Sequence, residues 1–155
     1  MRFTDLCYLL CMRLKRISFP LRNAERFRRR GIQIGEKTHV YRGVHLDLSK
    51  GSQISIGRNC VLTRGCTILA HDACLTNHGH TTAFKPVKIG DRCFFGVHSI
   101  VLMGVTIGDD CIIGAGSIVI KDIPAGSVVA GNPAKIICTV QALSEKRKDM
   151  WTGTK

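Results

Sequence analysis

The chain has 155 residues, of which 45% are hydrophobic and 22% are charged, and its formal net charge is +12. This length suits one domain with a hydrophobic core, and the Gly and Pro residues are too evenly spread to form a linker. The positive charge would favour a nucleic acid, but no zinc-finger spacing, aromatic RNA-binding signature or recognition-helix pattern accompanies it, so nucleic-acid binding is not expected.

Residues 1–31 form a basic arm in which nine Arg and Lys residues are opposed only by Asp5 and Glu25. Apolar residues recur at helical spacing and predict an amphipathic helix over residues 3–18. After a proline, a second short, Arg-rich helix is predicted over residues 21–30. The arm is therefore expected to be helical and to lie outside the repeat that follows.

Two roles of the arm remain open. It could cap the first part of the next domain, or residues 1–30 could contact an anionic membrane surface peripherally. Its apolar run, residues 5–12, is too short to cross a bilayer. No signal peptide is evident, so the expected location is the cytoplasm, with the inner face of the membrane as the alternative for the arm.

A six-residue repeat dominates residues 32–138. A large apolar residue returns at every sixth position in three runs: Ile34, Val40, Leu46; Ile56, Leu62, Ile68; and Ile89, Phe95, Val101, Ile107, Ile113, Val119. Gly often follows this residue directly, and a small side chain often stands four positions after it. Such a unit builds one flat side of a three-sided prism, with the large and small residues inside. The pattern predicts an all-β domain of stacked parallel coils.

The repeat is interrupted twice. The step from Leu46 to Ile56 is ten residues, and the step from Ile68 to Ile89 is twenty-one, so residues 75–86 are predicted to form a protruding loop. A long loop in a regular solenoid is usually functional. After the repeat, residues 139–155 are predicted to form a short C-terminal helix and tail.

The eight cysteines do not predict disulfides or a zinc site, because no C-x-x-C pair or Cys/His cluster with zinc spacing occurs. Four of them, Cys60, Cys66, Cys93 and Cys111, fall at the small inward position of the repeat. We interpret these four as buried packing residues.

Three segments carry a family resemblance: Lys88–Ile100 (KIGDRCFFGVHSI), Gly104–Pro124 (GVTIGDDCIIGAGSIVIKDIP) and Ala130–Ile137 (AGNPAKII). With the repeat, they resemble the hexapeptide-repeat acyltransferases, in particular sugar O-acetyltransferases related to galactoside and maltose acetyltransferases and to enzymes that decorate capsules and exopolysaccharides. The resemblance implies a left-handed parallel β-helix, a homotrimer, acetyl-CoA as co-substrate and no required metal. It further implies a small-molecule or lipid-linked sugar acceptor and a role in surface-glycan synthesis.

The resemblance implies that His71 is the general base. In this family, a histidine at the end of a coil, just before a protruding loop, deprotonates the acceptor hydroxyl. Many relatives have Pro after this histidine, and Asp72 stands here, which resembles the polysaccharide-modifying branch. No Cys or Ser lies in a recognisable nucleophile motif, so the hydroxyl is expected to attack the thioester directly.

The resemblance also implies a cofactor groove along the prism between subunits. Backbone groups near Val97 and Ala115 match positions that hydrogen-bond the pantetheine arm. Lys121 and Lys135 match cationic positions near the nucleotide phosphates.

Five further residues are candidates for acceptor binding. Arg42, His45 and Asp47 lie in the coil where relatives bind the acceptor. His78 lies in the protruding loop, and His98 matches a position that faces the groove.

Three alternatives remain open. The acceptor could be serine, an antibiotic or an amino sugar. The chain could resemble the γ-type carbonic anhydrases, with His71 and His98 as zinc ligands, although the close histidine pair that this family has downstream is missing. It could also be a catalytically silent scaffold.

Overall fold

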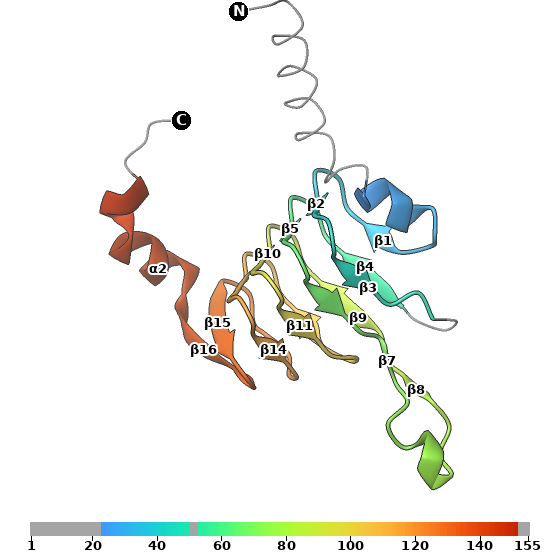
Figure 1. The fold of residues 1–155 in the computed structure, drawn as a ribbon. Coiled ribbons are helices and arrows are strands. Elements are labelled where there is room, and N and C mark those ends of the chain that lie inside the picture. The colour runs from blue at the N-terminus through green and yellow to red at the C-terminus, as the bar shows by residue number, and fades with distance from the viewer. Residues whose placement is uncertain (1–22, 50–52, 152–155) are drawn as a thin grey trace, which may run out of the picture.

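The computed structural model describes residues 23–49 and 53–151. The repeat region winds into a left-handed β-helix whose short strands stack coil upon coil into three parallel faces (Figure 1). The prediction of an all-β, parallel β-helix is confirmed.

Each face is one sheet, named here in the order in which the chain meets it. The first face contains β1 (Gln33–Ile34), β4 (Ile54–Ile56), β9 (Val87–Ile89) and β12 (Thr106–Ile107). The second face contains β2 (His39–Val40), β5 (Val61–Leu62), β10 (Phe94–Phe95), β13 (Ile112–Ile113), β15 (Ser127–Gly131) and β16 (Ala134–Thr139). The third face contains β3 (His45–Leu46), β6 (Thr67–Ile68), β11 (Ile100–Val101) and β14 (Ile118–Val119).

The faces meet at three corners. The first corner, between the first and second faces, consists of residues 35–38, 57–60, 90–93 and 108–111. The second corner, between the second and third faces, consists of residues 41–44, 63–66, 96–99 and 114–117. At the third corner the chain passes from the third face back to the first, through residues 47–49, 69–86, 102–105 and 120–122.

The large residues of the repeat stack on one another inside the prism. On the second face, Leu62 pairs in register with Phe95, and Phe95 pairs with Ile113. All three side chains are fully buried. Strands of two residues have too little surface to be stable alone, so each coil depends on its neighbours for burial and for hydrogen bonds.

The small inward position at the first corner does more than fill space. The thiols of Cys60 and Cys93 donate to the carbonyl oxygens of Gly90 and Gly108 on the following coil, both at 3.1 Å. The thiol of Cys111 donates to Pro124 in the same way. At the second corner, burial raises the pKa of the Cys66 thiol to about 11, which keeps it protonated and unreactive.

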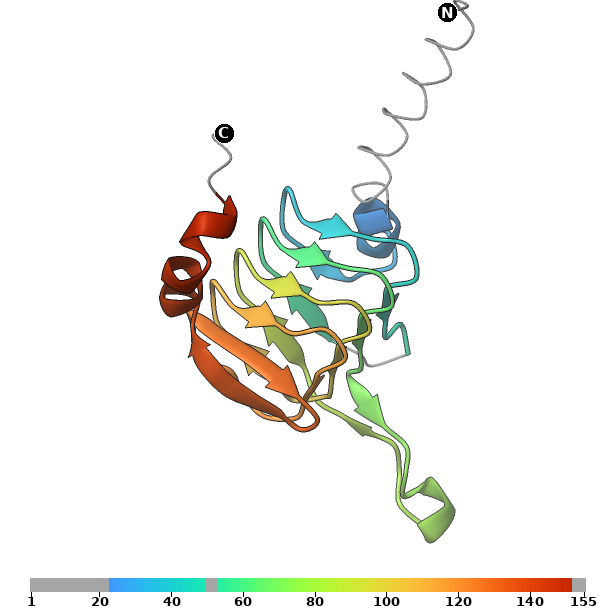
Figure 2. The ribbon, with the colours of Figure 1, turned by 60° about the vertical axis from the view of Figure 1, so that its left-hand side comes forward.

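The long interruption forms a hairpin that projects from the third corner (Figure 2). Its base is an antiparallel pair of strands, β7 (His71–Asp72) and β8 (Ala83–Phe84), and its tip is the 3-10 helix η1 (Thr76–His78). The excursion from the prism thus starts at His71, four residues before the predicted loop.

The C-terminal end departs from the six-residue repeat. Ile123 is buried and bridges to Ile107 on the first face, so a fifth coil begins only four residues after Val119. Strand β15 continues the second face, and β16 then turns back antiparallel to it.

Two short helices follow β16. The first is α2 (Val140–Lys146), whose N-terminus is capped by the Thr139 hydroxyl, which accepts from the Ala142 N–H at 3.1 Å. The second is the 3-10 helix η2 (Lys148–Trp151). Both lie within the predicted C-terminal helix and tail.

At the N-terminal end, residues 23–28 are helical and cover the first coil. Ala24 is fully buried in the core, and the Arg28 guanidinium donates to the carbonyl oxygens of Ile34 and Gly35, each at 2.8 Å. This part of the arm is therefore a cap. The helix predicted over residues 3–18 lies outside the described residues, and no helix among those described is long and apolar enough to cross a membrane.

The stacked core predicts that two leucines contribute very differently to the free energy of unfolding. Replacing the fully buried Leu62 by Ala should lower the free energy of unfolding by about 2–5 kcal/mol, because a cavity opens between coils. The matched change Leu75→Ala, at a side chain that is 52% exposed, should cost less than about 0.5 kcal/mol. Denaturant unfolding of both variants measures this, and equal losses would contradict the stacked core.

Candidate active site

His71 is held at the third corner by the neck of the hairpin. It begins β7 and pairs across the hairpin with Phe84 of β8. The two rings lie with their centroids 5.9 Å apart and tilted by 37°. The His71 side chain is 32% exposed, so the ring is supported on one side and accessible on another.

Asp47 lies beneath His71, at the same corner on the preceding coil. Its backbone N–H donates to Ile68, which places the carboxylate under the turn that leads into β7. Oδ2 accepts from His71 Nδ1 at 2.5 Å and from the Ala70 N–H at 3.0 Å. Oδ1 accepts from the Ser49 N–H at 2.9 Å. The residue is only 3% exposed, so its carboxylate is engaged within the protein.

These contacts keep the Asp47 carboxylate charged. Burial by itself would raise its pKa, but the hydrogen bonds from His71, Ser49 and Ala70 outweigh burial and hold the pKa well below its ordinary value. A carboxylate only accepts hydrogen bonds, so His71 Nδ1 must carry the hydrogen of this contact. In the neutral ring, Nε2 then has the free lone pair and can accept a proton from a hydroxyl.

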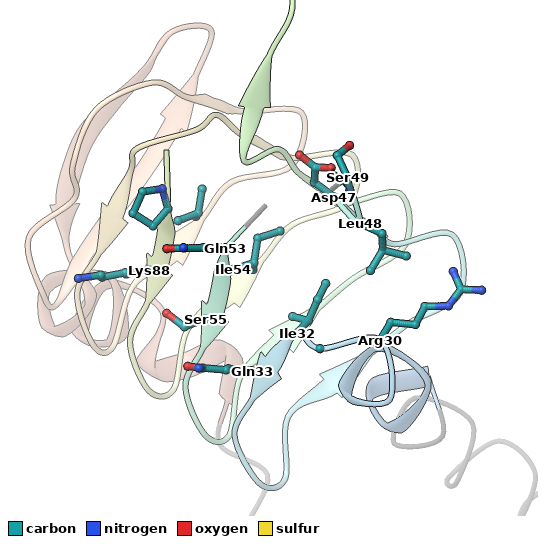
Figure 3. Close-up of a pocket in the computed structure, with 13 residues that line it drawn as sticks. Arg30, Ile32, Gln33, Asp47, Leu48, Ser49, Gln53, Ile54, Ser55 and Lys88 are labelled. Carbon is teal, nitrogen blue, oxygen red and sulfur yellow. Dashed lines mark hydrogen bonds between the residues drawn. The ribbon is translucent and has the colours of Figure 1, made fainter. Parts of the chain in front are cut away.

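A cavity of about 300 Å³, lined in part by Asp47, lies where the chain passes from the third face to the first (Figure 3). Asp47 and Ser49 line one end of it, near the start of the hairpin. Its wall on the first face carries the outward side chains of Gln33, Ser55 and Lys88, which are in register on β1, β4 and β9. The cavity can therefore offer amide, hydroxyl and ammonium groups to a polar molecule at this corner.

Val97 and Ala115 come together at the second corner. The Gly116 N–H donates to the Val97 carbonyl at 2.9 Å, which joins the third and fourth coils there. A Cβ atom on Gly96 would lie 2.4 Å from the Ala115 nitrogen, so only Gly allows the two coils to approach this closely. Both corner side chains are exposed.

The two predicted lysines lie at different places. Lys135 is exposed on β16 and pairs with Ala130, whose side chain covers Gly114 of the second corner. Lys135 thus lies beyond Val97 and Ala115 along the second corner. Lys121 is exposed at the third corner, on the same edge of the prism as His71.

The predicted acceptor residues also separate. Arg42 and His98 are exposed at the second corner, His45 is exposed on the third face, and His78 is exposed in η1 at the tip of the hairpin. Within one chain, the third face lies between the corner that holds His71 and the corner that holds Val97 and Ala115. The predicted site residues therefore form two groups on one chain.

Asp47 differs most from its predicted place. It was expected among the residues that face the acceptor, but its carboxylate is buried and bound to His71, Ala70 and Ser49. The register of the third face explains this contact. Leu46 is in register with Ile68, so the next residue, Asp47, must lie against the turn before His71.

The described residues, 23–49 and 53–151, contain no group of three His, Cys, Asp or Glu side chains placed to hold a metal ion. His71 and His98, the two zinc candidates of the carbonic anhydrase alternative, lie at different corners of the chain.

Comparison with known proteins agrees with this fold. A family model described as the hexapeptide repeat of succinyl-transferase matches residues 86–121. Protein CapG of Staphylococcus aureus is 37% identical over 79% of this chain and 74% of its own length. The putative acetyltransferase YvoF of Bacillus subtilis is 35% identical over 76% of this chain, a match that spans 66% of YvoF, just under two thirds of its length.

Among solved structures, galactoside acetyltransferase in complex with coenzyme A superposes with a TM-score of 0.61 and 27% identity. That match covers 73% of this chain and 67% of the galactoside enzyme. With a relative as similar and as fully covered as CapG, and with the matched repeat, the family is established. The chain belongs to the hexapeptide-repeat acetyltransferases.

Proposed function

We propose that this protein is an acetyl-CoA-dependent O-acetyltransferase that acts on a sugar hydroxyl, with His71 as the general base. The observation that carries the proposal is the contact between His71 Nδ1 and the buried, charged Asp47. An ordinary surface histidine is not expected to donate a hydrogen bond to a buried carboxylate that also accepts two backbone N–H groups. In a member of an acetyltransferase family, such a pair suits a base with one fixed tautomer.

The reaction follows from this geometry. His71 Nε2 takes the proton of the acceptor hydroxyl while the oxygen attacks the thioester carbonyl. The Asp47 carboxylate stabilises the imidazolium that forms. When the tetrahedral intermediate collapses, the carbon–sulfur bond breaks and the imidazolium returns its proton to the leaving thiolate. General-base catalysis of this kind contributes about 10²–10⁴-fold.

The proposed binding site for acetyl-CoA runs along the second corner. Backbone groups near Val97 and Ala115 would bind the pantetheine arm, since a carbonyl that already accepts one hydrogen bond retains a second lone pair. The ammonium group of Lys135, and that of Lys121 from the third corner of the adjacent subunit, would pair with the phosphates. The likeness to a galactoside acetyltransferase that binds coenzyme A supports this assignment.

The separation of the two corners supports a homotrimer. In one chain, the third face lies between His71 and the proposed cofactor residues Val97, Ala115 and Lys135, so the base of one subunit would serve acetyl-CoA held by the next. The outer side of the second face carries Val61, Phe94, Ile112 and Val128 in register, and Phe94 is 42% exposed. An apolar row of this kind suits contact with another copy.

The proposed acceptor is a small-molecule or lipid-linked sugar in surface-glycan synthesis, and the proposed location is the cytoplasm. The likeness to a galactoside acetyltransferase supports a sugar hydroxyl. Asp72 after the base, where many galactoside-type relatives carry Pro, favours the polysaccharide-modifying branch. Peripheral contact of residues 1–30 with an anionic membrane would bring the enzyme close to a lipid-linked precursor.

Replacing His71 by Ala should reduce turnover at least about a hundredfold, because no other group would take the hydroxyl proton. Release of the CoA thiol measures turnover, with the sugar that the wild type uses best in an acceptor screen. As a control, Lys146→Ala, at an exposed side chain on α2, should leave turnover unchanged. Normal turnover in the His71 variant, with folding intact, would reject the proposed function.

Asp47→Asn should lower kcat at least about tenfold with little change in the KM for acetyl-CoA, because the ring would lose its orienting carboxylate. The folded-state pKa of Asp47 is depressed, so its stabilisation is full above the unfolded value of about 4 and is lost as pH falls toward the folded value. The Asn variant should therefore lose less stability than the wild type between about pH 5 and 2. Thermal unfolding across this range tests the pair, and identical acid profiles would contradict it.

Changing Lys121 and Lys135 together to Glu should raise the KM for acetyl-CoA at least about tenfold and leave the KM for the acceptor unchanged, because each replacement opposes a phosphate. Lys146→Glu, an exposed change on α2, is the control for net charge. Initial-rate kinetics with each substrate varied in turn gives both constants. Equal losses for both substrates would contradict a phosphate-binding role.

A further inference from the structure

The second corner carries a line of cationic side chains on the coils that precede Val97 and Ala115. The second-face strands are in register, so Arg42, Arg64, Val97 and Ala115 occupy the same corner position on four successive coils. Coils stack about 4.8 Å apart, which brings the backbones of Arg42 and Arg64 close together. Arg64 was not singled out by the sequence, because its alignment with Arg42 depends on the ten-residue interruption between their coils.

The turns at this corner are shaped around these side chains. A Cβ atom on Gly65 would lie 2.3 Å from His98 Nδ1, so the imidazole occupies the space that a side chain would need there. His98 has a left-handed backbone, with φ 56°, and its N–H donates to the Arg64 carbonyl at 3.0 Å. A Cβ atom on Gly43 would lie 3.8 Å from Arg64 Cγ, so the stem of Arg64 passes beside the turn that contains Arg42. Arg42, Arg64 and His98 thus lie on adjacent turns of the second corner.

The charge of this corner is not neutralised by the part of the chain that the structure describes. At the first corner, Arg58 pairs with Asp91 at 2.9 Å and Arg92 pairs with Asp110 at 2.6 Å. The second-corner residues include no Asp or Glu, and no carboxylate among residues 23–49 and 53–151 lies within ion-pair distance of Arg42 or Arg64. Cations stacked on successive coils repel each other, and an anion bound between them would remove that repulsion.

We propose that Arg42, Arg64 and His98 bind an anionic group of the acceptor, a carboxylate or a phosphate monoester, and that the enzyme therefore prefers acidic sugars. This inference rests on the proposed function. In that arrangement the phosphate end of acetyl-CoA lies toward Lys135 and its thioester lies toward the N-terminal coils. Arg64 and His98 belong to the second and third coils, between which His71 leaves the prism. The anion site is thus level with the base along the axis of the prism, where the acceptor has to lie.

Two matched ligand pairs test the proposal by titration calorimetry, with coenzyme A present. Trigalacturonic acid and its trimethyl ester differ in the charge of the carboxylates and in three added methyl groups, and glucose 6-phosphate and glucose differ by the phosphate. The wild type should bind at least one acid at least about tenfold more tightly than its neutral partner, with a difference that shrinks at high salt. The pair that shows the preference identifies the carboxylate or the phosphate as the anion.

The double variant Arg42→Gln, Arg64→Gln should bind the acid and its neutral partner alike, and the matched change Lys37→Gln, an exposed cation at the first corner, should keep the preference. Coenzyme A should bind the double variant as it binds the wild type, which tests the proposed function separately. The inference is overturned if the wild type shows no preference for either acid, or if Lys37→Gln abolishes the preference as well.

Discussion

The inward side chains of this protein are buried only because each coil rests on the next one in register. A strand of two residues has no stability of its own, so Leu62 needs Phe95 above it and Phe95 needs Ile113. The same register decides which residues meet at the outer corners, far apart in sequence. Asp47 lies under the turn before His71 because Leu46 pairs with Ile68, and Arg42 aligns with Arg64 because Val40 pairs with Leu62. Packing inside the prism therefore determines the chemistry outside it.

The corners differ in how their charges are balanced. At the first corner, each Arg of the middle coils is paired with an Asp of the coil that follows. At the third corner, the buried carboxylate of Asp47 is matched to one imidazole and two backbone N–H groups. At the second corner, Arg42 and Arg64 face outward without a described partner. Among the described residues of these corners, the charges of Arg42 and Arg64 are thus left without an ion pair.

Much of the fold could be predicted, because the repeat places large residues from Ile89 to Val119 at one spacing and that spacing belongs to one kind of solenoid. The four-residue step to Ile123 and the antiparallel return of β16 could not be predicted, since both depart from the repeat. The family resemblance, together with its place before the interruption, predicts that His71 is the base, and this role stays a prediction. The contact of His71 with Asp47 was not predicted. Asp47 lies in the irregular ten-residue step after Leu46, and the spacing of residues within one run of repeats does not show which coils become neighbours across such a step.

The hairpin that begins with β7 and ends with β8 leaves and re-enters the prism at one point, and the residues beyond its neck are exposed except for the half-buried Thr82. Its length and composition can therefore drift over evolutionary time without disturbing the register of the coils on either side. Changes in this segment leave the scaffold and the imidazole at the neck in place. The sequence of the hairpin is in this way uncoupled from the selection that preserves folding of the prism.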